Sequence, residues 1–155
     1  MTQPILTREG IAHALFSLIQ GLPGLVTTSR RLLHWSEVPA EQQPAAFLPE
    51  GKQIPKNSPD GNQVIWRYEY SIFLYAYLED TTKTPASQLN NLLDALEAAL
   101  KPSQVGPPGF SGSMQVLGDT TGRIRHAWIS GAIETDEGVL GSQAIAIVPI
   151  EIEVI

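Results

Sequence analysis

Two segments of the chain carry apolar residues at the three- and four-residue spacing that predicts amphipathic helices. The first helix is expected to begin after Thr7, a favourable N-cap residue, and to end at Gly21. The second is expected over 85–101, where Thr84 provides the cap and Pro85 occupies the first helical position. Each segment has a single apolar stripe, so each helix should pack against another layer of the protein.

A long strand is predicted at 64–78, where side chains alternate between two faces. One face is apolar throughout and is expected in the core; it consists of Val64, Trp66, Tyr68, Tyr70, Ile72, Leu74, Ala76 and Leu78. The other face begins with polar residues and ends with Phe73, Tyr75 and Tyr77. A strand of this length would span roughly 50 Å, far more than is usual. It should therefore bend at a bulge or project beyond its own domain.

Between the first helix and this strand, one strand is predicted in GLVTTSRRLLHW and a short one in PAAFLPEG. Prolines repeatedly interrupt 36–62, and the remainder of that stretch, especially EGKQIPKNSPDGN, is expected to form a long exposed loop. PDGN within it is a turn signal, because proline presets one backbone angle and glycine permits positive φ.

Three further strands are predicted after the second helix, in SMQVLG, RIRHAWISGAIETD and QAIAIVPIEIEVI. A hairpin turn at GDTTG would join the first two, and the longer loop DEGVLGS would join the last two. Pro149 is expected at an edge or a bulge, because proline cannot donate to a sheet ladder. Glu151 and Glu153 alternate on one face, as in an edge strand protected from indiscriminate pairing.

The order of these elements predicts an α+β fold: a mostly antiparallel β-sheet with two α-helices packed on one face, and long loops. The chain has 155 residues, enough for one domain, 1–155, with a substantial core. Charged residues make up 17% of the chain, less than the roughly 25% of a typical domain. A low charged fraction leaves more neutral surface, which is typical of a subunit within an assembly.

The net charge of −6 makes phosphate neutralisation a poor basis for nucleic-acid binding, although it suits the wall of a channel through which DNA slides. The absence of cysteine excludes disulfides, thiolate metal sites and cysteine nucleophiles. The N-terminus lacks the pattern of a signal peptide, and no apolar run is long enough to predict a transmembrane helix, so no membrane contact is expected.

Catalytic patterns are missing from the sequence. His13, His34 and His126 have no acidic or histidine partner at ligand spacing on the same element, and IETDEG lacks the alternation of a calcium loop. No nucleophile elbow, P-loop, dinucleotide fingerprint or zinc motif occurs. We therefore predict no catalytic residue, no metal site and no cofactor, and we expect the protein not to be an enzyme.

The remaining candidates are contacts between subunits, because aromatic residues and arginine are enriched at interfaces. The aromatic end of the long strand has two interpretations of equal weight: a subunit contact, or a patch covered within the monomer. The small basic groups are expected to pair with acidic strand ends of a neighbouring subunit. The candidate interface residues are Arg30, Arg31, Phe73, Tyr75, Tyr77, Arg123, Arg125, Glu151 and Glu153.

The segments LNNLLDALEAALKP and HAWISGAIETDEGVLGSQAIAIVPIEIEVI, with RRLLHWSEVPAEQQPAAFLPEGKQ upstream, resemble tail-completion and tail-terminator proteins of tailed bacteriophages and prophages. The resemblance covers most of the chain and depends on overall layout. It implies an α+β fold and a hexameric ring at the head-proximal end of the tail tube. There the ring would end polymerisation of the tube and join the tail to the head.

The resemblance also implies the partners: further copies of the chain in a homohexamer, the tail-tube protein and the head-side connector or neck protein. DNA would pass through the lumen of the ring without sequence-specific binding. The expected location is the tail or neck of the virion, after synthesis in the cytoplasm of a host bacterium. Two alternatives remain: another neck or minor-tail adaptor protein of the particle, and a small enzyme with an unrecognised site.

Overall fold

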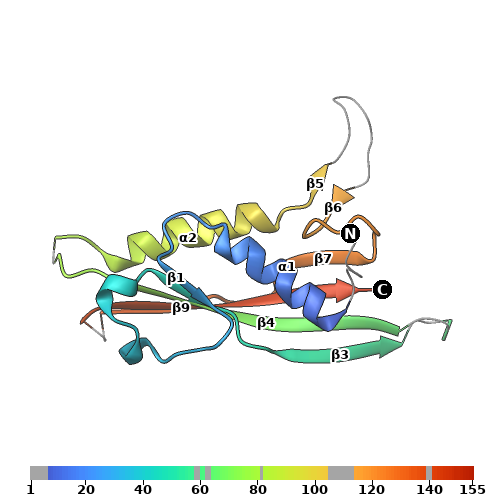
Figure 1. Ribbon diagram of the computed structural model, residues 1–155, viewed down its shortest axis with the longest axis horizontal. Helices are drawn as coiled ribbons and strands as arrows, with labels where there is room; N and C mark the ends of the chain where they lie inside the picture. Colours follow the sequence, from blue (N-terminus) through green and yellow to red (C-terminus); the bar gives the residue numbers. More distant parts are fainter. Residues whose placement is uncertain (1–6, 58–59, 62–63, 81, 105–113, 139–140) are drawn as a thin grey trace.

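The computed structural model of the chain describes residues 7–57, 60–61, 64–80, 82–104, 114–138 and 141–155. Figure 1 shows a long sheet with the two α-helices running along it. The predicted α+β class, with a mostly antiparallel sheet and two helices on one of its faces, is confirmed. Neither helix in this part of the chain has the length and apolar content needed to cross a bilayer.

The main sheet has seven strands, in the order β1-β2-β4-β9-β7, with β3 also pairing with β4 and β8 also pairing with β9. Among the strand pairs of this sheet that the structure describes, only β1–β2 is parallel. The strands are β1 Thr27–Ser29, β2 Ala45–Phe47, β3 Lys52–Asn57, β4 Val64–Tyr77, β7 Ile124–Ile129, β8 Glu134–Gly138 and β9 Gly141–Val154. A separate small sheet pairs β5 Ser103–Gln104 with β6 Met114–Gln115, and the 3-10 helices η1 and η2 are Trp35–Glu37 and Ala40–Gln42.

Both predicted helices form. Helix α1 is Arg8–Gln20, and the Thr7 hydroxyl accepts a hydrogen bond from the Gly10 amide at 3.0 Å, as expected of an N-cap. Helix α2 is Pro85–Leu100, and Thr84 occupies its N-cap position, although its side chain makes no capping bond. The apolar stripes of both helices join the same core cluster as the inner faces of β4 and β9. Burial against one continuous sheet face is therefore what holds both helices.

Strands β4 and β9 form the long central pair, with register running from Trp66 opposite Val154 to Tyr77 opposite Gln143. The even-numbered face of β4 is buried from Tyr68 to Ala76, which confirms its predicted place in the core. Val64, at the start of the strand, is instead 48% exposed. The predicted length of this strand is confirmed to within one residue. The predicted bulge is not found, because the pairing of β4 with β9 runs from Trp66 to Tyr77 without a shift in register.

Several predicted boundaries are wrong. The strand predicted in 24–35 shrinks to β1, and the loop predicted in 50–62 contains β3, a strand with mostly exposed residues that tolerates Pro55 at the margin of the sheet. Residues 58–59 and 62–63 of that loop lie outside the described residues. The strand predicted in 123–136 is two strands, β7 and β8.

The turn predicted at GDTTG is present, but it does not join a hairpin, because β6 pairs with β5 and not with β7. The loop predicted at DEGVLGS is also shorter than expected, since Gly138 already pairs with Gly141; residues 139–140 lie outside the described residues. Finally, β9 is a central strand with partners on both sides, so Glu151 and Glu153 do not protect an edge.

The main sheet narrows in its middle to two strands. On one flank, β3 pairs with β4 as far as Glu69, and β2 pairs with it from Phe73. On the other flank, β7 pairs with β9 as far as Ile150, and β8 begins to pair at Ile147. Both gaps fall at one level, because residues 70–72 of β4 lie opposite residues 148–150 of β9. We call this level the waist of the sheet.

Proline and glycine fit the waist. The carbonyl of Pro149 accepts a hydrogen bond from the Ser130 amide at 3.0 Å, so the proline nitrogen faces the gap between β7 and β8. Pro149 therefore lies in a central strand without interrupting a ladder of hydrogen bonds, because no flanking strand faces its nitrogen. On the opposite flank, a Cβ on Gly51 would lie 1.7 Å from the Glu69 carbonyl oxygen, so this close approach requires glycine.

Candidate functional site

The sheet face that points away from the helices is divided by the waist into two halves of different chemistry. We call the part formed by β3, β7 and the adjoining ends of β4 and β9 the charged half. Its charged and aromatic side chains include Lys52, Lys56, Arg67, Glu69, Arg125, His126, Trp128, Glu151 and Glu153. We call the part formed by β2 and the other ends of β4 and β9 the aromatic half, which contains Ala45, Phe47, Phe73, Tyr75 and Ile145. Strand β8 flanks this half and places Glu134 and Asp136 on the same face.

The charged half is a ladder of ion pairs between neighbouring strands. Glu153 lies between Arg125 on β7, at 3.4 Å, and Lys56 on β3, at 3.9 Å. Arg67 on β4 lies 3.4 Å from Glu69 and 3.9 Å from the Glu151 carboxylate. These pairs match acidic to basic side chains across four strands, and they keep a broad polar surface compatible with water.

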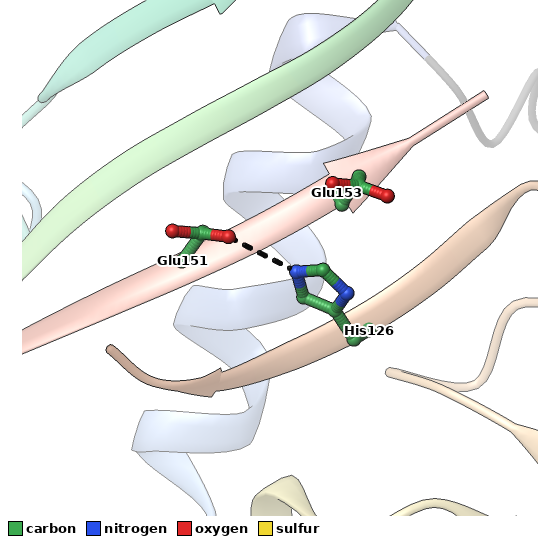
Figure 2. Close-up of side chains that lie close together, drawn as sticks. All are labelled: His126, Glu151 and Glu153. Atoms are coloured by element: carbon green, nitrogen blue, oxygen red, sulfur yellow. Dashed lines mark hydrogen bonds and ion pairs between the residues drawn. The ribbon is translucent and has the colours of Figure 1, made fainter.

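His126 lies 3.2 Å from Glu151, and Figure 2 shows its ring near both glutamates of β9. One ligand atom from each of His126, Glu151 and Glu153 can be chosen so that all three lie within 4.8 Å of one another, a set that could hold a divalent cation. However, Arg67, Arg125 and Lys56 already face the two carboxylates. The cluster is therefore balanced as an ion-pair network by the chain itself.

Trp128 gives the charged half its main apolar surface. Its ring stacks on His126 with centroids 3.8 Å apart, and half of the residue is exposed. Beside it, a hollow of about 300 Å³ lies between β7 and the end of α2, lined largely by apolar groups that include Leu100, Pro102 and Ala127. The hollow has no set of convergent nucleophile and base, so it suits a contact better than catalysis.

The aromatic half is covered by the chain itself. Tyr75 is only 3% exposed, and the centroid of its ring lies 5.3 Å from that of Phe47. Its hydroxyl donates a hydrogen bond to the Leu33 carbonyl at 2.7 Å. Val38 and Trp35, from the segment that carries η1 and η2, close the cluster over this part of the sheet. Burial raises the pKa of Tyr75 above its ordinary value.

A buried amide pair fastens the covering segment to β9. The side-chain amide of Gln43 donates to the Gln143 side-chain oxygen at 3.0 Å, and that of Gln143 donates back at 2.9 Å. Gln43 also donates to the Val38 carbonyl at 3.0 Å, and both glutamines are buried. Satisfied buried amides fix the segment in one position, because unpaired ones would be costly.

The structure does not gather the sequence-predicted interface residues into one patch. Phe73 and Tyr75 lie in the aromatic half, where Tyr75 is buried within the chain, whereas Tyr77 is half-buried at the end of β4. Arg125, Glu151 and Glu153 belong to the charged half. The charged half thus includes residues of β3 and β7 that the sequence did not indicate.

The other predicted arginines lie outside both halves. Arg30 forms ion pairs with Glu9 and Glu50, and the neighbouring Arg30 guanidinium lowers the pKa of Glu9. Arg31 follows it as an exposed residue. Arg123 donates from Nε to the Ile155 carbonyl at 2.8 Å, so it ties the turn before β7 to the end of the chain.

Sequence reasoning missed the lysines of β3, Trp128, and the contact between His126 and β9. His126 and Glu151 are 25 positions apart in sequence and meet only through the β7–β9 register. The alternation of His126 and Trp128 with the buried Ala127 was the signal available for β7. A single sequence gives no signal for the register that joins the strands.

No protein-family model matches the chain, and no curated protein matches it at a significant level. Among solved structures, the chain is similar to one from the virion of a native gene transfer agent particle, at 9% identity, with 93% of each chain covered and a TM-score of 0.54. A second solved chain aligns at 15% identity over 100% of this chain and 96% of its own length, with a TM-score of 0.43. At these identities, the first likeness shows a shared fold, and the second carries no argument.

Proposed function

We propose that the protein is a structural subunit of a phage-like particle and acts as the tail terminator. In this role it forms a homohexameric ring at the head-proximal end of the tail tube. The ring ends tube polymerisation and contacts the head-side connector, while DNA passes through its lumen. The protein performs no catalysis and needs no cofactor, and its place is the tail or neck of the virion.

The observation that carries the proposal is the fold match over 93% of both chains with a protein of a gene transfer agent virion. The match includes nearly the whole chain, so it is a likeness of complete architecture. The resemblance of the sequence to tail terminators supports the same particle class independently of the coordinates. An acidic chain, with net charge −6, also suits a lumen that DNA phosphates must traverse without binding.

The surface chemistry supports assembly over catalysis. The described surface offers a charged sheet face, a half-exposed tryptophan and exposed strands at the margins of the sheet. The hollow beside Trp128 is largely apolar, and none of its lining residues is a serine, threonine or cysteine that His126 could activate. An adaptor elsewhere in the neck or a minor tail protein would use the same surfaces, and it is the second candidate.

The test is to assemble tail tubes from purified tube protein with and without this chain. The proposal predicts that added protein appears as a ring at one end of each tube in negative-stain images, and that tube growth stops. Light scattering after size-exclusion chromatography should give a mass of about six chains for the ring released from tubes. Tubes that elongate without change and never carry the protein would contradict the terminator role.

A further inference from the structure

Two strands at opposite margins of the sheet carry opposite charge. Strand β3 pairs with β4 on one margin, and β8 pairs with β9 on the other. Within the described residues, neither strand has a second strand partner, so each presents an unpaired edge. Lys52 and Lys56 lie on β3, whereas Glu134 and Asp136 lie on β8.

Most charged side chains on these two edges form no ion pair within the described part of the chain. Lys52 and Glu134 are exposed and Asp136 is half-buried, and among the described residues none of the three has an ion-pair partner. Lys56 reaches Glu153 only at 3.9 Å. By contrast, the basic Arg30 is fully engaged with Glu9 and Glu50. The free charges of the sheet margins are thus basic on one side and acidic on the other.

We infer that β3 of one copy pairs edge to edge with β8 of the next copy, so that the sheets of neighbouring subunits join head to tail. This inference rests on the proposed ring and names the surfaces that build it. All four charged side chains lie on the open face of the sheet, which is the face that points away from the helices. Their register partners on β4 and β9 lie on that face too. They therefore meet on one side of the joined sheet.

The charges select this contact over the alternatives. Two β3 edges would bring lysines together and two β8 edges would bring carboxylates together, and like charges opposite each other are destabilising. A β3–β7 contact would place Lys52 and Lys56 beside Arg125. Edge lysines and Pro55 resist indiscriminate pairing, so an acidic partner strand is the one favoured. A contact between two different edges is heterologous, which is the kind that closes rings.

Strand direction and stagger fit the same arrangement. Successive antiparallel pairs from β3 through β4 and β9 to β8 give β3 and β8 opposite directions, so neighbouring copies meet in antiparallel fashion. Strand β3 lies level with the C-terminal end of β9, whereas β8 lies level with the first half of β9. At about 3.3 Å per residue, β3 and β8 are therefore displaced along the strand direction by roughly 25 Å. Strands in the ring must therefore be inclined to its axis, as they are in closed barrels.

Engineered cysteines test the contact directly, because the chain has none of its own. Lys52→Cys and Asp136→Cys are prepared separately, assembled with tail tubes and oxidised, and products are separated without reductant. Equal mixing of the two variants should give covalent dimers, whereas either variant alone should not. The double variant should give a ladder that reaches the size of the ring. Dimers formed equally well by one variant alone would overturn the inference.

Charge reversal provides the second arm. Lys52→Glu with Lys56→Glu, or Glu134→Lys with Asp136→Lys, should each weaken assembly about tenfold or more. Combining all four changes restores opposite charges and should bring assembly to within about threefold of the unchanged protein. A folding defect at one margin would not be repaired by changes at the other. Lys83→Glu, at an exposed lysine that lies outside both strands and outside the hollow beside Trp128, is the control.

The outcomes separate the two hypotheses. If the unchanged protein assembles but the reversed variants assemble equally well and the cysteine pair stays unlinked, the edge pairing is wrong while the ring stands. If the unchanged protein forms no ring and never binds tubes, the proposed function itself fails. Reduced assembly in both reversed pairs, together with recovery in the combined variant and a normal control, supports the inference.

Discussion

The charged and aromatic halves of the open sheet face are built on the same two strands but end in different environments. In the aromatic half, Val38 and Trp35 cover the rings of Phe47 and Tyr75. In the charged half, ion pairs run across β3, β4, β9 and β7, and Trp128 is half exposed. One half is completed by the chain, while the other is left available for a partner.

This difference shows what the waist of the sheet does. It lies where β4 changes from charged residues to aromatic ones, at Ser71 opposite Pro149. On each side of that level, a different flanking strand supplies the neighbours that the side chains need. Strand β4 thus contributes to a covered aromatic cluster at one end and to an exposed charged surface at the other, while its pairing with β9 continues without a break.

The largest effect is expected from opening the aromatic half. Phe47→Ala should lower the free energy of unfolding by about 3–5 kcal/mol, because it removes a fully buried ring and leaves a cavity. Urea unfolding followed by circular dichroism measures the change. The matched variant is Trp128→Ala in the charged half, where the exposed ring should cost less than about 1 kcal/mol. Equal losses in the two variants would contradict the distinction between the halves.

A smaller effect is expected at the turn that places β7 in the charged half. The buried Asp119 carboxylate accepts from the Ile124 amide at 2.9 Å and from the Thr121 amide at 2.9 Å. Burial alone would raise the pKa of Asp119, but these hydrogen bonds outweigh it and hold the pKa below 3.8. Asp119→Asn should therefore destabilise the protein by about 2 kcal/mol at neutral pH.

The sign of the pH dependence follows from that lowered pKa. Stability from ionised Asp119 is fully present above the ordinary pKa of 3.8 and is lost as the pH falls through the lower folded-state pKa. The difference between the unchanged protein and Asp119→Asn should thus shrink at acidic pH. Thermal unfolding across a pH series measures it. A difference that stays constant down to the lowest pH at which the protein folds would exclude this role for the carboxylate.

The hydroxyl of Tyr75 tests the covering segment alone. Tyr75→Phe keeps the ring but removes the hydrogen bond to the Leu33 carbonyl, and it should cost about 1 kcal/mol. Hydrogen exchange should also show faster opening of residues 33–43, while β4 remains protected. Unchanged exchange in that segment would mean that the bond does not hold the cover in place.

The smallest effect is expected in the ion-pair ladder. Glu153→Gln removes the carboxylate shared by Arg125 and Lys56, both about half exposed, so the cost should be about 1 kcal/mol or less. The loss should diminish in high salt, which screens the remaining exposed charges. Chemical unfolding at two salt concentrations measures it. A loss as large as that of Phe47→Ala would show that the charged half is a structural core.

The helices and the central strand could be predicted from the sequence because their signals are local. Thr7 and Pro85 mark helix starts, and the alternation around Ile72 marks the buried face of β4. Strand β3 escaped prediction because Pro55 and its polar neighbours describe an exposed edge, whose pattern is that of a loop. Its pairing with β4 supplies the stability that local propensity lacks.

The candidate site was predictable only in part. Glu151 and Glu153 were identified from their alternation, but they were assigned to an edge because a sequence does not specify how many neighbours a strand has. Strand β9 is flanked on both sides, and its glutamates meet Arg67 and His126 through register. The aromatic end of β4 had two interpretations, and the structure shows cover for Tyr75 from within the chain.

The central proposal, that this chain is a structural subunit at the junction of head and tail, is tested most directly by locating it on assembled particles. Antibodies against the purified protein, labelled with gold, would be applied to particles made by the host and examined by negative-stain microscopy. Label is expected at the head-proximal end of the tail on most particles. Particles that carry no label there, or label confined to the distal tip of the tail, would contradict it.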